Sequence, residues 1–130
     1  EEMGTQGKLE VTKKNKVTIV NFLEVAFLDE VSIKSLGDEL EAIVKEENYI
    51  NLVINFQNVD YLSSAVLGRL VKIYKLVKRN KGKMKLCCIK KNILHVFKIT
   101  KLDRMFEIFK NQEKAISSFK KKKFKFFWSK

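Results

Sequence analysis

The hydrophobic and polar positions along this chain change their spacing several times. Residues 9–13 alternate apolar with polar side chains, and residues 17–22 are rich in β-branched side chains. With a turn residue, Asn15, between them, these two runs predict a β-hairpin. From Ser35 the apolar residues recur every three or four positions until about Asn48, which is the spacing of a helix with one buried face. The start of the chain therefore predicts two paired strands followed by a helix.

Strands and helices then alternate along the rest of the chain. The predicted strands are the apolar runs at residues 50–56, 83–89 and 105–109, and the predicted helices cover residues 67–79, 93–99 and 113–119. Strands connected through helices lie parallel to one another. This order predicts an α/β fold, with a mixed, mostly parallel sheet of about five strands, about four helices and an opening β-hairpin. We place this domain at residues 8–119, between a disordered N-terminal end (1–7) and a basic-aromatic C-terminal tail (120–130).

Charge is divided unevenly between the two halves of the chain. The formal net charge is +12 over 130 residues. Residues 1–60 contain six basic and twelve acidic side chains, whereas residues 61–130 contain 21 basic and three acidic ones. Such asymmetry indicates an acidic partner, a nucleic acid or an anionic membrane surface for the second half. Lysines spread over solvated helices would explain the same charge without any partner.

Several classes of protein are disfavoured by the sequence. No window approaches about 18 uninterrupted apolar residues, and the first residues lack the apolar core of a secretory signal. The adjacent Cys87 and Cys88 cannot frame a disulfide scaffold, which favours the cytoplasm, and strand alternation predicts one thiol on each face of the sheet. The motifs of phosphate loops, serine hydrolases and zinc helices are absent, and His95 lies among apolar residues as a packed or surface side chain. We therefore expect neither an enzyme nor a bound metal or cofactor.

The most informative segment is residues 59–70, which follow a predicted central strand and open a helix. Ligands and modifications concentrate at the carboxyl ends of strands in open α/β sheets. One of the two serines, Ser63 or Ser64, is expected to cap the helix, because a serine hydroxyl accepts hydrogen bonds from free backbone N–H groups. A phosphate on the other serine would add a charge of roughly −1.5 to −2 beside the positive helix end. Both a purely structural role and a switch remain open at this point.

The same segment carries a family resemblance. The Ser-Ser-Ala sequence followed by Leu67-Gly68 at the start of a helix, together with the element order, resembles a STAS domain of the anti-sigma-factor antagonists. The pair Leu28-Asp29 resembles a Leu-Asp pair that such domains carry before their first helix. The resemblance covers about residues 8–118. In this family the loop usually reads Asp-Ser-Ser/Thr-Gly-Leu-Gly, and a partner kinase phosphorylates the serine that follows the aspartate.

Aligning the Leu-Gly pair places Ser64 at the phosphorylated position, with Ser63 as the alternative. Ser63 then stands in place of the aspartate, Ala65 in place of the second Ser/Thr, and Val66 in place of the glycine. The resemblance implies a partner-switching regulator that binds an anti-sigma factor with serine kinase activity when unphosphorylated. Phosphorylation would weaken that complex, a phosphatase would restore it, and ATP would belong to the kinase. The expected contact residues are Asp60, Tyr61, Ser63, Ser64, Val66 and Arg69, and a homodimer is left open.

The predicted tail is the second distinctive segment. It contains Lys120, Lys121, Lys122, Lys123, Phe124, Lys125, Phe126, Phe127 and Trp128. Lysines beside aromatic rings suit an anionic membrane surface, and the same pairing suits single-stranded nucleic acid. A solvated extension, or aromatic rings folded back on the domain, would need no partner. The alternative function is thus an adaptor or scaffold recruited by the basic C-terminal half to a membrane or a nucleic acid, with Ser63 and Ser64 only capping a helix.

Overall fold

Six strands form one sheet in the computed structural model, which describes residues 3–6, 9–24, 26 and 29–128, with the backbone alone for 3–6 and 121–128. In spatial order, which is also chain order, they are β1 (Met3–Gln6), β2 (Leu9–Lys14), β3 (Val17–Phe22), β4 (Asn51–Asn55), β5 (Lys83–Cys87) and β6 (Glu107–Phe109). The first three strands pair antiparallel, and β3 to β6 pair parallel. The mixed α/β sheet with its opening hairpin is confirmed.

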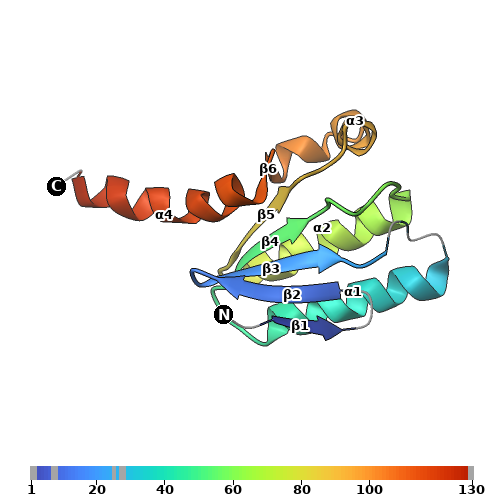
Figure 1. Ribbon diagram of the computed structural model, residues 1–130, viewed down its shortest axis with the longest axis horizontal. Coiled ribbons are helices and arrows are strands. Elements are labelled where there is room, and N and C mark those ends of the chain that lie inside the picture. The colour runs from blue at the N-terminus through green and yellow to red at the C-terminus, as the bar shows by residue number, and fades with distance from the viewer. Residues whose placement is uncertain (1–2, 7–8, 25, 27–28, 129–130) are drawn as a thin grey trace.

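Four helices connect or follow the parallel strands (Figure 1). They are α1 (Glu30–Lys45), α2 (Ser64–Arg79), α3 (Lys91–Ile99) and α4 (Gln112–Trp128), and a short 3-10 turn, η1 (Leu102–Arg104), precedes β6. Buried side chains of α1, α2 and α3 join the larger hydrophobic cluster on one face of the sheet, whereas α4 packs on the other face. Because α1 and α2 each lead into a parallel strand, both begin at the edge where the preceding strands end.

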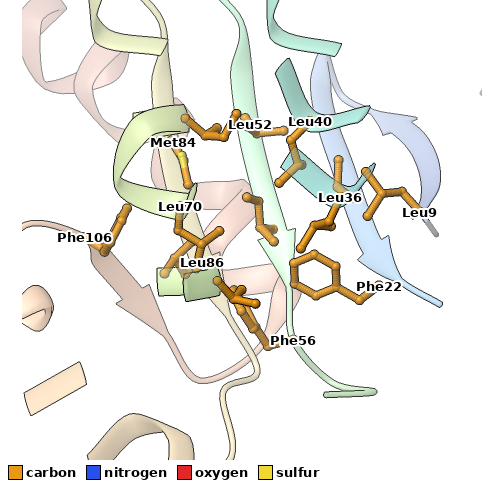
Figure 2. Close-up of a cluster of buried hydrophobic side chains, with 14 of the residues drawn as sticks. Leu9, Phe22, Leu36, Leu40, Leu52, Phe56, Leu70, Met84, Leu86 and Phe106 are labelled. Atoms are coloured by element: carbon orange, nitrogen blue, oxygen red, sulfur yellow. The ribbon is translucent and has the colours of Figure 1, made fainter. Parts of the chain in front are cut away.

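The larger cluster follows from strand alternation. In β4, Leu52 and Ile54 face α1 and α2, while Val53 between them faces the opposite side. Figure 2 shows side chains from both helices and from neighbouring strands meeting in this layer. The rings of Phe22 and Phe56 meet edge to face at 5.0 Å between centroids, at the carboxyl edge of the sheet. The core thus extends to the base of the loop that leads to Ser63 and Ser64.

The opposite face of the sheet is covered by the first turns of α4. Ala115 and Ile116 are buried against a smaller apolar cluster drawn from β3, β4 and β5. Lys85 of β5 is buried on this face, where its ammonium donates a hydrogen bond to Ser118 Oγ at 2.7 Å and lies 4.3 Å from the centroid of the Phe119 ring. The helix is therefore held by polar as well as apolar contacts.

Several boundaries and one orientation differ from the sequence-based expectations. Residues 3–6 form strand β1, although we expected residues 1–7 to be disordered. The first helix begins at Glu30, five residues before the predicted start, because Asp29 caps it by accepting a hydrogen bond from Ser32 N at 2.8 Å. Helix α4 continues to Trp128, beyond the predicted end of the domain. Cys88 follows the end of β5 with a φ of 64° and packs in the same cluster as Cys87, not on the other face.

Candidate functional site

Side-chain amides hold the first residues of the loop between β4 and α2. Asn55, the last residue of β4, accepts a hydrogen bond from the backbone N–H of Gln57 at 2.7 Å. Asn58 donates from its side chain to the carbonyl oxygen of Phe22 at 3.2 Å. Further along, the backbone of Tyr61 forms an isolated parallel bridge with Ala26. The loop is thus connected to the end of β3 and to the segment that follows it. These contacts fix the position of the two serines at the end of the loop.

The two serines differ in structure although they are adjacent. Ser63 is the N-cap of α2, with extended backbone angles, and its hydroxyl accepts a hydrogen bond from Val66 N at 3.3 Å. Ser64 is the first residue of the helix, and its side chain is exposed. The expectation that one serine caps the helix is therefore confirmed for Ser63. Ser64 is the one whose hydroxyl is presented to solvent.

The electrostatic setting of Ser64 favours an added negative charge. The N-terminal end of a helix carries a partial positive charge from its free N–H groups. The first turn of α2 contains no acidic side chain, and its solvent face carries basic residues further along, including Lys72 and Lys75. A phosphate at the first helical position would therefore be tolerated by the helix itself. Any effect of that phosphate on binding must arise at the surface of a partner.

Asp60 links the loop to the next helix. Its carboxylate forms an ion pair with Lys90, the N-cap residue of α3, and its carbonyl oxygen accepts a hydrogen bond from Asn92 Nδ2 at 3.3 Å. Both side chains of the ion pair remain partly exposed. The beginnings of α2 and α3 are therefore joined at the same edge of the sheet.

The expected contact residues are not equally accessible. Asp60, Tyr61 and Ser64 are exposed, with 52% of Tyr61 accessible. Val66 is completely buried in the main core, so its inclusion in the contact surface was wrong: the third helical position turns inward toward the sheet. Arg69 is half-buried and lies across α1, where a Cβ on Gly37 would come within 3.0 Å of Arg69 Cδ. Leu67 and Leu70 pack inward as expected.

Two exposed apolar residues at this edge were not predicted. Leu23, just after β3, is 44% accessible, and Val31, in the first turn of α1, is 79% accessible. Together with Tyr61 they place three large exposed side chains on segments at the carboxyl edge of the sheet, where α2 begins. Val31 lies on the side of α1 opposite to its buried Leu36 and Leu40, so helical spacing would have identified it if the start of the helix had been placed correctly.

The described residues provide little for metal or thiol chemistry. Within them, no group of three His, Cys, Asp or Glu side chains is close enough to hold a metal ion. Burial raises the pKa of the Cys87 thiol above its usual range, and the hydrogen bond with Cys88 acts in the same direction. His95 is exposed on α3.

Of the nine residues considered for membrane or nucleic-acid contact, Lys120 is exposed, and the side chains of 121–128 lie outside the described residues.

Anti-sigma-factor antagonists are among the solved structures that share this fold. A STAS domain anti-sigma-factor antagonist from Planctomyces limnophilus superposes with a TM-score of 0.77 at 19% identity, over 85% of this chain and 96% of its own. An anti-sigma factor antagonist from Mycobacterium paratuberculosis gives 0.74 at 21% identity, over 85% and 91%. The phosphorylated form of SpoIIAA, a Bacillus cell fate determinant, gives 0.63 at 12% identity, over 85% and 98%. The STAS domain model matches residues 8–115, and the chain therefore belongs to the STAS domain family.

Proposed function

We propose that this STAS domain is a partner-switching regulator of the anti-sigma-factor antagonist type and has no enzymatic activity of its own. The unphosphorylated protein binds an anti-sigma factor that has serine kinase activity, phosphorylation of Ser64 weakens the complex, and a phosphatase restores it. ATP is bound by the kinase, which places the switch in the cytoplasm. The observation that carries the proposal is the exposed side chain of Ser64 directly after the capping Ser63.

The different positions of the two serines support Ser64 as the acceptor. A kinase must reach the hydroxyl oxygen of its substrate serine. The oxygen of Ser63 already accepts the hydrogen bond from Val66 N, so modifying it would disturb the first turn of α2. The exposed Ser64 hydroxyl can be modified while the cap stays in place. The phosphorylated structure of SpoIIAA, which has the same fold, agrees with a phosphate being carried by this kind of domain.

The surroundings of Ser64 support control of a protein interface. Leu23, Val31 and Tyr61 are exposed apolar side chains on the segments that flank the beginning of α2. A partner that covers them would remove water from Ser64 as well. A phosphate confined there without a cationic partner loses hydration, which weakens the complex strongly. A loss of about 2.7 kcal/mol already lowers affinity about 100-fold.

Immobilised wild-type protein and three variants test this proposal in a lysate of the organism's own cells. Ser64→Glu imitates the charge, Ser64→Ala removes the acceptor, and Ser117→Glu places the same charge on an exposed serine of α4 as the matched control. We expect wild type, Ser64→Ala and Ser117→Glu to retain a serine kinase that Ser64→Glu does not retain. Once that kinase is purified, the Ser64→Glu variant should bind it about 100-fold more weakly than the Ser117→Glu variant does.

The purified kinase also provides a direct readout of the acceptor. Incubated with labelled ATP, it should transfer phosphate to wild type and to Ser117→Glu but not to Ser64→Ala. Equal binding of Ser64→Glu and wild type would overturn the switch. Undiminished labelling of Ser64→Ala would overturn the assignment of the acceptor.

A further inference from the structure

The first half of α4 fixes the direction in which the helix leaves the sheet. Gln112 accepts a hydrogen bond from Asn55 Nδ2 at 2.7 Å, at the carboxyl end of β4. Two turns later, Ser118 accepts a hydrogen bond from Lys85, in the middle of β5. Lys120 and Ile116 then line a small surface pocket together with Asn15, in the turn between β2 and β3. Helix α4 therefore runs from the carboxyl edge of the parallel strands to their amino edge.

Beyond this point the backbone of α4 extends past the edge of the sheet. Figure 1 shows the last turns of α4, in red, extending past the β2–β3 turn, while α1 and α2 begin at the opposite end of the molecule. This extension, residues 120–128, contains five lysines and four aromatic residues, and the chain has no acidic residue after Glu113. Among the described helices, none is long and apolar enough to cross a membrane. The extension is thus a basic and aromatic helix projecting from a folded domain.

We propose that residues 120–128 bind the surface of a bilayer that contains anionic phospholipids. Lysines are attracted to anionic headgroups, and aromatic rings settle at the boundary between headgroups and acyl chains. Helices that lie in this boundary carry basic residues together with Trp, Phe or Leu side chains. Single strands of nucleic acid instead need a groove or platform on which successive bases stack. The helical continuation of α4 therefore favours a lipid surface over a nucleic acid.

This binding would also orient the domain. The extension leaves at the amino edge of the sheet, whereas Ser64 lies at the carboxyl edge. A domain attached to the membrane through residues 120–128 presents the beginning of α2 away from the lipid. Membrane binding and partner binding would then occupy opposite ends of the molecule and would not compete. The inference does not depend on phosphorylation of Ser64.

Trp128 provides a local probe because it is the only tryptophan in the chain. We would titrate the full chain with vesicles of equimolar phosphatidylcholine and phosphatidylglycerol, and with vesicles of phosphatidylcholine alone. Binding to the anionic vesicles should shift Trp128 emission to shorter wavelength and should weaken as salt is added. Phosphatidylcholine alone should leave the emission unchanged.

A matched pair of charge variants tests whether the segment itself is responsible. One variant carries glutamine in place of Lys120, Lys121, Lys122 and Lys123; the other carries glutamine in place of Lys72, Lys75, Lys91 and Lys98, which are exposed on α2 and α3. The net charge is the same in both. The first variant should lose about 100-fold in affinity for anionic vesicles, and the second should lose less than about threefold. Circular dichroism would check that both variants remain folded.

Three results would overturn the inference. The first is an unchanged Trp128 emission with anionic vesicles. The second is an equal loss of binding in the two lysine variants, which would indicate attraction by net charge alone. The third is tighter binding to a single-stranded RNA oligonucleotide than to the anionic vesicles, which would assign the segment to nucleic acid.

Discussion

The hydroxyl oxygen of Ser63 lies 3.3 Å from the backbone nitrogen of Val66 and accepts a hydrogen bond from it, which closes the first turn of α2. This bond assigns different roles to two adjacent serines. Ser63 contributes to the stability of the helix, and Ser64 is left exposed at its positive end. The distinction can be tested without knowing any partner.

Alanine substitutions should separate the two serines by stability. Ser63→Ala removes the cap and should lower the free energy of unfolding by about 1 kcal/mol. Ser64→Ala removes only an exposed hydroxyl and should change it by less than about 0.5 kcal/mol. Urea denaturation followed by circular dichroism measures both values. Equal losses in the two variants would show that Ser64 has a structural role that the proposal does not include.

Two glycines should respond in opposite directions to alanine. Gly68 lies on the exposed face of α2 with no heavy atom within 4 Å of an added Cβ, so Gly68→Ala should stabilise the protein by about 0.5 to 1 kcal/mol. At Gly82 an added Cβ would meet the carbonyl oxygen of Ile50 at 2.6 Å. The backbone must shift to accommodate it, and Gly82→Ala should cost about 1 to 3 kcal/mol. Thermal melts should show a higher midpoint for Gly68→Ala and a lower one for Gly82→Ala. A higher midpoint for Gly82→Ala would contradict the close approach of Ile50, and a lower one for Gly68→Ala would contradict the open space at that position.

Lys85 should tolerate methionine better than alanine. Its ammonium is buried between β5 and α4, and its ion pair with Glu107, at 3.5 Å, involves a carboxylate that stays largely exposed. Lys85→Met keeps the length of the side chain and leaves no charge buried alone, so we expect a change within about 1 kcal/mol. Lys85→Ala opens a cavity beneath α4 and should cost about 2 to 4 kcal/mol. If methionine were as harmful as alanine in urea denaturation, the polar contacts rather than the packing would hold α4.

The two thiols should react at different rates. Burial raises the pKa of the Cys87 thiol, so less of the reactive thiolate is present, and reagents reach it poorly. Cys88 is only partly buried. With a disulfide reagent, the Cys88→Ala variant, which retains Cys87, should react at least about tenfold more slowly than Cys87→Ala. In denaturant the reaction rates of the two variants should converge. A difference that persists in denaturant would show that the folded structure does not cause it.

The raised pKa of Cys87 also predicts a loss of stability in alkali. The folded state holds the thiol proton more tightly than the unfolded state does. The contribution of the protonated Cys87 thiol to the free energy of unfolding is therefore complete below the usual thiol pKa. This contribution is lost as the pH rises above that pKa. Replacing Cys87 by alanine should reduce this alkaline loss, measured as the difference in unfolding free energy between wild type and variant at each pH.

Strand and helix order could be predicted from the sequence because buried positions repeat with clear periods. The alternation in β2, the β-branched run in β3, the apolar run in β4 and the helical spacing of Leu67, Leu70 and Val77 each predicted their element. The start of α1 was misplaced because Val31 is apolar yet exposed, which obscured the pattern around the Asp29 cap. The hydrogen bond that Ser32 N donates to Asp29 sets the start of this helix, and aspartate is a common capping residue, so the cap itself was the signal to follow.

The candidate site was predictable in part for a similar reason. The position of the serines after a central strand was enough to predict that one of them caps a helix. The burial of Val66 was also readable, since it precedes the buried Leu70 by four positions on the same helical face. The ion pair between Asp60 and Lys90 joins residues 30 positions apart, and no local pattern predicts such a contact.

Mapping of phosphate on the protein isolated from its own cells tests the central claim most directly. Trypsin releases residues 46–69 as one peptide, in which fragmentation between Ser63 and Ser64 distinguishes the two acceptors. The proposal predicts phosphate on Ser64 in part of the population, with a fraction that changes with growth conditions. Phosphate on Ser63 alone, or no phosphate on this peptide under any growth condition, would contradict it.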